Sequence, residues 1–208
     1  MSFALPAVQE PPNIEQTLRA MVRFQIQLAN LAQSNLVAED LVWMAQRATE
    51  LMAEAYLLMD RMTLPQRKQA LAEEGWIVSG ILGVLIAFNK GSTELGPTIA
   101  LGVEPESVRG KPITIAAGTG FTSRDPAPAA MLVDDIRQIN TQIRYLNTSR
   151  PTIDDMIILF TSIQSVQTTI YQLAPILSID ELQLLTLNLS VAMADMADLI
   201  KTFVAQQA

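Results

Sequence analysis

The chain contains no cysteine and no histidine among its 208 residues. This absence removes the commonest zinc and iron ligands, every thiol nucleophile and every Ser–His relay. Basic residues are also few: 14 Lys and Arg stand against 21 Asp and Glu, which gives a formal net charge of −7. A nucleic-acid binder needs basic surface to meet phosphates, so this composition argues against a nucleic-acid partner. We therefore expect no cofactor, no bound metal and no catalytic residue.

Long uninterrupted hydrophobic runs are lacking as well. The longest, with Gly and Ser allowed, extends from Gly75 to Phe88 and has 14 residues, fewer than the roughly 18–20 of a membrane-spanning helix. The N-terminus, MSFALPAVQEPPNIEQ, has neither the basic region nor the apolar region of a secretory signal. We therefore expect a protein that is soluble as synthesised and is either cytoplasmic or released without a signal peptide.

Helical periodicity is the most frequent pattern in the chain. Half of its residues are hydrophobic, and in residues 13–62 they recur every three or four positions. The pattern weakens around Ser34, so this stretch fits either one long helix or, as we favour, two helices. Thr63 and Gln66 have the spacing of a capping box, and a short helix is expected from there to Glu74, with Gly75 as its C-terminal stop.

The last third of the chain, 129–208, has the same helical character. Its apolar residues step by three and four, and capping boxes are expected at Thr152 with Asp155 and at Ser178 with Glu181. Short links between these helices imply antiparallel neighbours, and no internal repeat is apparent. The fold class is therefore mainly α. We expect an N-terminal arm (1–12) and a bundle of five or six helices built from 13–74 and 129–208.

The middle of the chain, 75–128, differs from both flanks. All nine glycines lie between Gly75 and Gly120. The β-branched stretch 76–88 fits either a buried strand or a buried helix, because periodicity alone does not separate them. Residues 98–103 and 111–117 alternate apolar and polar side chains around a turn-rich link, which predicts a β-hairpin with one apolar face. We expect an apolar, Gly/Pro-rich insertion, or tongue, that contains this hairpin.

Three adjacent carboxylate pairs are the strongest candidates for chemistry: Glu39–Asp40, Asp134–Asp135 and Asp154–Asp155. Paired carboxylates can share acid and base roles or bind a divalent cation. Consecutive helical residues, however, point about 100° apart, so one pair does not converge on one ion. We favour capping and solvated surface as their role. The Gly118–Gly120 segment lacks the Gly-Lys-Ser/Thr of a phosphate-binding loop and is interpreted as a turn or hinge.

The order of segments resembles that of a known family. Amphipathic helices are followed by GWIVSGILGVLIAF with a Gly-rich sequel, and then by more helices. This layout resembles the helical pore-forming toxins of the cytolysin A type. The resemblance implies an apolar tongue that folds against a helical bundle in the soluble form and inserts into a membrane on oligomerisation.

The insertion is also the best candidate for contact with something outside the subunit, because Gly80 and Gly83 permit close approach of another surface. We expect it to meet a lipid bilayer or a neighbouring subunit. The expected contact residues are Trp76, Ile77, Val78, Ile81, Leu82, Val84, Leu85, Ile86, Phe88, Ile99, Leu101, Ile113 and Ile115.

Three functions remain open. The favoured one is a non-catalytic, membrane-active component of the pore-forming type, which oligomerises and uses the apolar insertion. The alternative is a structural subunit of a symmetric assembly, such as a virus or phage particle, whose hairpin or N-terminal arm reaches a neighbour. The third is a small-molecule enzyme without His or Cys. The first two predict a homo- or hetero-oligomer.

Overall fold

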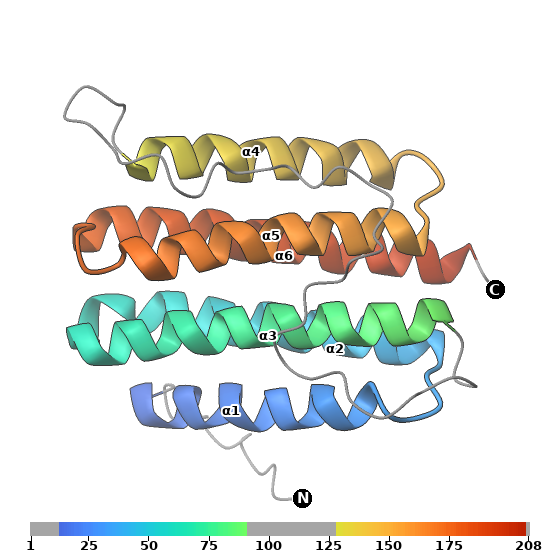
Figure 1. Ribbon diagram of the computed structural model, residues 1–208, viewed down its shortest axis with the longest axis horizontal. Coiled ribbons are helices and arrows are strands. Elements are labelled where there is room, and N and C mark those ends of the chain that lie inside the picture. Colours follow the sequence, from blue (N-terminus) through green and yellow to red (C-terminus); the bar gives the residue numbers. More distant parts are fainter. Residues whose placement is uncertain (1–12, 91–127, 207–208) are drawn as a thin grey trace, which may run out of the picture.

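The computed structural model describes residues 13–90 and 128–206. This part of the chain forms six α-helices and contains no strand, so the mainly helical prediction is confirmed (Figure 1). The β-hairpin predicted within 98–117 and the arm 1–12 lie outside the described residues. The helices are α1 (Ile14–Leu31), α2 (Ala38–Leu58), α3 (Leu64–Lys90), α4 (Pro128–Asn147), α5 (Ile153–Leu173) and α6 (Ile179–Ala205), with a short 3-10 helix, η1 (Met59–Arg61), after α2.

The stretch 13–62 forms two helices, as favoured, rather than one. At the start of α1 the Asn13 side chain accepts a hydrogen bond from the Gln16 backbone N–H at 2.8 Å. At its end the Ser34 hydroxyl donates to the Leu31 carbonyl at 2.8 Å. Both bonds satisfy backbone groups that a helix terminus leaves without an intrahelical partner. The weak point around Ser34 is therefore a true helix boundary.

The prediction of a short helix that ends at Gly75 is wrong. Helix α3 continues through Gly75 to Lys90, so residues 75–90, which the sequence places in the insertion, are its C-terminal half. A glycine inside a helix costs only about 1 kcal/mol relative to alanine. Burial of the apolar residues that follow outweighs this cost, since Ile77, Val78 and Ile81 are all fully buried. The stretch 76–88, left open between strand and helix, is helical.

The bundle has four central helices and two flanking ones. Helix α2 packs on α6, and α3 packs on α5; α1 covers α3 and α2 from one side, while α4 covers α6 and α5 from the other (Figure 1). Neighbouring central helices run in opposite directions, as short connections require. The capping boxes predicted at Thr152 and Ser178 are present, with backbone N–H donors 2.9 and 2.8 Å from the Asp155 and Glu181 carboxylates.

The chain contains an internal repeat that the sequence does not reveal. Helices α2 and α5 begin at Ala38 and Ile153, and α3 and α6 begin at Leu64 and Ile179; both pairs of positions are 115 residues apart. Helix α1 packs on α3 and α2 as α4 packs on α6 and α5. In Figure 1 equivalent helices run in the same direction, α1 and α4 lie at opposite edges, and α2/α5 and α3/α6 exchange front and rear, as a twofold axis parallel to the helices requires. The halves 13–90 and 128–205 are two copies of one three-helix unit.

Burial repeats at the same spacing. Leu18, Met21 and Leu28 of α1 are buried, as are Val133, Ile136 and Ile143 at the equivalent positions of α4. The buried pairs in α3 and α6 are Ala70/Leu185, Leu71/Thr186, Glu74/Leu189, Ile77/Ala192, Val78/Met193, Ile81/Met196, Leu82/Ala197, Val84/Leu199 and Leu85/Ile200.

One aromatic pair marks the pseudo-twofold axis. Phe88 and Phe203 occupy equivalent positions in α3 and α6, and their rings meet edge to face with centroids 6.4 Å apart. Two equivalent residues contact each other only where the axis passes between them. The axis therefore runs between the C-terminal ends of α3 and α6, and the core is shared by the two halves.

Candidate functional sites

The residues predicted to contact a bilayer or partner divide into four groups. Ile77, Val78, Ile81, Leu82, Val84 and Leu85 face the core and are at most 6% exposed, whereas Trp76 is 46% exposed. Ile86 and Phe88 are partly buried against the core. The remaining four, Ile99, Leu101, Ile113 and Ile115, lie outside the described residues. In this structure most of the apolar stretch is therefore an internal packing surface.

Helix α3 is nonetheless long and apolar enough to cross a membrane, judged by length and composition alone. The 14-residue run counted from the sequence is only part of a 27-residue helix. Half of its most apolar 18-residue window is buried inside the bundle. A core helix shared between two halves meets the same criterion, so the feature alone does not distinguish core from membrane span.

A buried carboxyl group lies at the α3–α5 interface. Glu74 is 0% exposed, and its Oε2 lies 3.1 Å from the Gln167 amide nitrogen, which also donates to the Leu71 carbonyl at 2.8 Å. Burial raises the pKa of Glu74 from 4.5 to about 8, and the hydrogen bond from Gln167 offsets this only in part. Glu74 is therefore mostly protonated at neutral pH.

The pseudo-twofold axis gives this polar pair an apolar counterpart. At the α2–α6 interface the residues equivalent to Gln167 and Glu74 are Met52 and Leu189, both 0% exposed. The same packing position thus holds either a carboxyl–amide pair or two hydrophobic side chains. Burial of Glu74 was not predicted from the sequence, because the acidic pair Glu73–Glu74 before a glycine suggests an exposed helix end. Glu74 lies three positions from both Leu71 and Ile77, and this spacing, which places it on the apolar face of the helix, could have predicted its burial.

The adjacent carboxylate pairs serve local structure. Asp40 and Asp155 accept hydrogen bonds from the backbone N–H groups of Val37 and Thr152, at 2.9 Å in each case. They cap equivalent helices, α2 and α5, where negative charge is favoured by the helix dipole. Capping, the role favoured from the sequence, is confirmed for these two residues.

The other members of these pairs lie on the surface. Asp134 forms a 3.2 Å ion pair with Arg137 one turn away, and exposed pairs of this kind contribute little to stability. Partial burial and the neighbouring Asp134 raise the pKa of Asp135. Across residues 13–90 and 128–206, no three His, Cys, Asp or Glu side chains gather in a way that could hold a metal ion.

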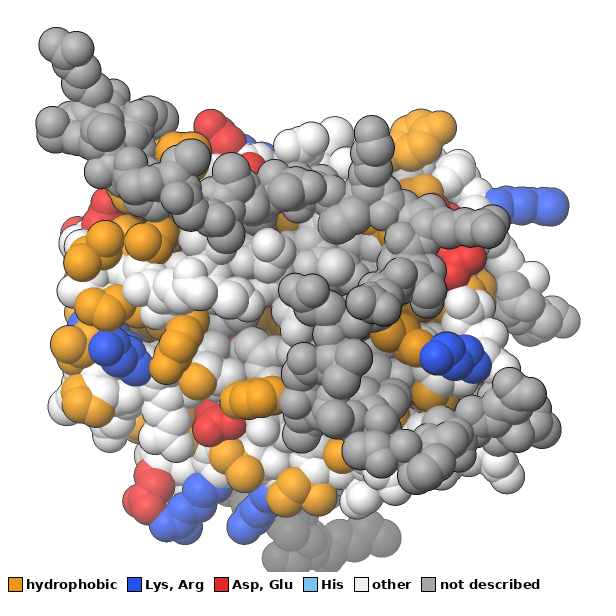
Figure 2. All heavy atoms as spheres, viewed as in Figure 1, with side chains coloured by type: hydrophobic (Ala, Val, Ile, Leu, Met, Phe, Trp, Pro, Cys, Tyr) orange, Lys and Arg blue, Asp and Glu red, His pale blue; other side chains and the backbone are white. Residues whose placement is uncertain are grey.

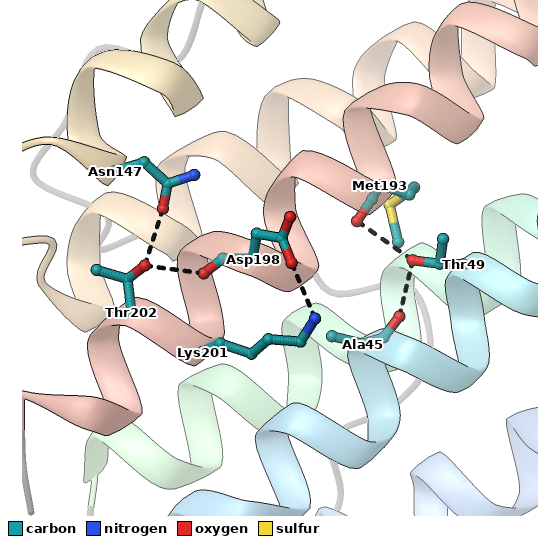
Figure 3. A network of polar contacts seen from close by, with 7 residues as sticks. All are labelled: Ala45, Thr49, Asn147, Met193, Asp198, Lys201 and Thr202. Carbon is teal, nitrogen blue, oxygen red and sulfur yellow. Dashed lines mark hydrogen bonds and ion pairs between the residues drawn. The ribbon is translucent and has the colours of Figure 1, made fainter.

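Polar contacts between helices fix their register (Figure 3). The Thr202 hydroxyl lies 3.1 Å from Asn147 Oδ1 at the end of α4 and 3.0 Å from the Asp198 carbonyl of its own helix. The Thr49 hydroxyl of α2 lies 3.3 Å from the Met193 carbonyl of α6. Each group positions one helix against another.

A pocket of about 440 Å³ opens between α4 and α5. Its lining is mostly apolar and includes Leu146, Ile158 and Leu159. Polar groups are added by Thr141, Gln142, Tyr145 and Asp155. Ligand pockets of this size with a mostly apolar lining and a few polar groups are the usual form of small-molecule sites.

Among the residues that the structure describes, two exposed apolar surfaces stand out. On the face seen in Figure 2, hydrophobic side chains gather at the end of the bundle where α3 and α6 begin. Ile176 and Leu64, which are 72% and 46% exposed, lie at this end. The second surface, which we call the α6 stripe, consists of Leu184, Leu187 and Val191, exposed to 48%, 40% and 39%.

Comparison with known proteins adds no relative. No family model matches the chain, and neither a curated protein nor a solved structure is significantly similar to it.

Proposed function

We propose that this protein is non-catalytic and acts by association, pairing with a second copy of itself through the α6 stripe. The observation that carries this proposal is the exposure of Leu184, Leu187 and Val191 on one helix face. Their steps of three and four residues are the spacing with which one helix packs against another. This corresponds to the second function considered from the sequence, a structural subunit of a symmetric assembly.

The stripe is suited to meeting its own copy. In an antiparallel pair centred on Leu187, Leu184 of one subunit would lie opposite Val191 of the other, so the same patch serves both subunits. Beyond the stripe the exposed face of α6 becomes charged, with Asp198 and Lys201 joined at 2.8 Å. An apolar centre with a charged border is the usual anatomy of a protein interface.

The expected strength of association is low. Stable specific interfaces bury about 1,200–2,000 Å² in total, and three partly exposed side chains provide only the centre of such an area. We therefore expect a dimer that forms at high concentration and that further contacts in a larger assembly can reinforce. The hairpin predicted within 98–117, with Ile99, Leu101, Ile113 and Ile115, stays a prediction for one such contact.

Replacing Leu187 by Glu tests the proposal. A charge at the centre of the stripe would have to be desolvated on pairing, so we expect the variant to keep the mass of one chain, 22.8 kDa, while the wild type approaches twice that mass as concentration rises. Light scattering across a concentration series measures this. Leu187 is 40% exposed, so the fold should survive, which circular dichroism checks.

Ile26→Glu is the matched control, because Ile26 is an equally apolar, 58% exposed residue on α1. It should associate like the wild type. A wild type that stays at the mass of one chain at every concentration would contradict the proposal. So would a Leu187→Glu variant that associates as the wild type does.

A second candidate function is insertion of α3 into a bilayer, as the toxin-like layout implies. It is supported by the length and composition of that helix. Insertion would require α3 to leave α1 and α5, on which it packs, and to expose six residues now at most 6% exposed. Release of dye from lipid vesicles tests it, provided that the variants used still fold.

A further inference from the structure

The two halves of the bundle differ most clearly in the groove between the first and second helix of each unit. In the first half this groove, between α1 and α2, holds the indole ring of Trp43. That ring packs edge to face on Phe24, with centroids 5.7 Å apart at an interplanar angle of 67°. Phe24 is 1% exposed, so it forms the floor on which the indole rests.

The second half lacks both rings. The residues equivalent to Trp43 and Phe24, 115 positions further along, are Ile158 and Ile139. Ile139 is 1% exposed and belongs to the core, whereas Ile158 is partly exposed and carries no ring. The pocket of about 440 Å³ between α4 and α5 lies here, and Ile158 forms part of its wall.

The remaining walls of the pocket also have counterparts in the first half. Leu146 and Leu159 are equivalent to Leu31 and Met44, so the apolar character of the groove is the same in both halves. Among the residues that line the pocket, Ile158 is the one whose equivalent in the first half, Trp43, carries an aromatic ring. What is missing from the second groove is a flat aromatic ring of about the size of indole.

From this comparison we infer that the α4–α5 pocket binds a small planar aromatic molecule of one or two fused rings. The occupied groove of the first half shows what such a surface accepts: a ring laid against apolar side chains, with one edge toward solvent. Edge-to-face and stacked contacts make aromatic rings favourable occupants of apolar grooves. Gln142 and Tyr145 place polar groups in the lining, where a ring N–H or hydroxyl would find a partner.

Indole itself is the probe, and ligand-observed NMR on the full chain is the measurement. We expect saturable binding with one site per chain. Ile158→Trp should place an indole ring in the pocket as Trp43 does in the first half, and should weaken binding at least about tenfold. Ile158→Val, which keeps the pocket open, is the matched control and should bind like the wild type.

The first half supplies the converse experiment. Trp43→Ile should open the equivalent groove between α1 and α2 and raise the number of indole sites from one to two. Absence of saturable binding to the folded wild type would overturn the inference, and so would unchanged binding by a folded Ile158→Trp variant. Neither substitution touches the α6 stripe, so a failure here is independent of the proposed self-association.

Discussion

The double variant Glu74→Leu/Gln167→Met is expected to unfold at a higher urea concentration than the wild type at pH 8. It gives the α3–α5 interface the two apolar residues that its equivalent already holds, Leu189 and Met52. Replacing both partners of a buried hydrogen bond by apolar groups of the same shape can be nearly neutral or stabilising, and the charge that forms on the buried Glu74 near pH 8 destabilises the wild type further. We expect a gain of about 1–3 kcal/mol at pH 8, measured from urea unfolding curves.

The gain should depend on pH, because the unfolded chain releases the Glu74 proton at a lower pH than the folded chain does. The carboxyl group ionises near pH 4.5 when unfolded and near pH 8 when folded. The stability contributed by the protonated form is thus fully present below pH 4.5. It is lost as the pH rises toward 8, by up to about 1.4 kcal/mol per pH unit. The advantage of the double variant should shrink between pH 8 and pH 5.

Two single variants separate the causes. Glu74→Gln keeps the shape but cannot ionise, so the wild type should lose stability relative to it as the pH rises from 5 to 8. Glu74→Leu alone leaves the Gln167 amide without its side-chain partner and should be less stable than the double variant by about 1–3 kcal/mol. An equal gain by the double variant at pH 5 and pH 8 would contradict the buried, protonated state of Glu74.

Ile81→Asp is expected to abolish folding. Ile81 is 0% exposed in the half of α3 that packs against the rest of the bundle, and an unpaired carboxylate there would cost more than about 4 kcal/mol. Circular dichroism and urea titration should show no cooperative unfolding transition. If this variant releases no dye from lipid vesicles, the cause would therefore be an unfolded bundle rather than a lost membrane contact.

Gly83→Asp is the matched variant in the same helix. A Cβ atom added at Gly83 meets no atom of the neighbouring helices within 4 Å, so the fold should persist, with a change of no more than about 1 kcal/mol. If α3 inserts into bilayers, this folded variant should release less dye than the wild type, because it carries a charge into the apolar stretch. Equal dye release by both would count against insertion of α3. A cooperatively folded Ile81→Asp variant would contradict the core role of the helix.

The sequence predicted local structure better than architecture. Caps at Thr152 and Ser178 were predictable because each satisfies helix-terminal N–H groups through residues three positions apart. The predicted helix end at Gly75 was wrong because tertiary packing decides it. The helix continues past Gly75 so that Ile77 and Ile81 are buried, and no local sequence signal carries that information.

The repeat was hidden for a related reason. Few equivalent positions carry the same residue, among them Asp40/Asp155, Tyr56/Tyr171 and Phe88/Phe203. What repeats is burial, and a core position requires only a hydrophobic side chain of suitable size. Two halves can thus share one fold with almost no shared sequence.

The candidate sites were the least predictable part. Six predicted contact residues turned out to be core, because an apolar, glycine-rich stretch suits a tightly packed central helix as well as it suits an exposed tongue. Ile158, which lines the pocket between α4 and α5, is equivalent to Trp43 of the first half. That correspondence becomes visible only through the structural repeat.

Amide hydrogen exchange of α3, with and without lipid vesicles, tests the central claim most directly. If α3 is a core helix shared by the two halves, amides from Ile77 to Leu85 should be among the slowest in the chain, exchanging only through global unfolding. Vesicles should leave their rates unchanged. Fast exchange of these amides in the free protein, or a change of their rates when vesicles are added, would contradict it.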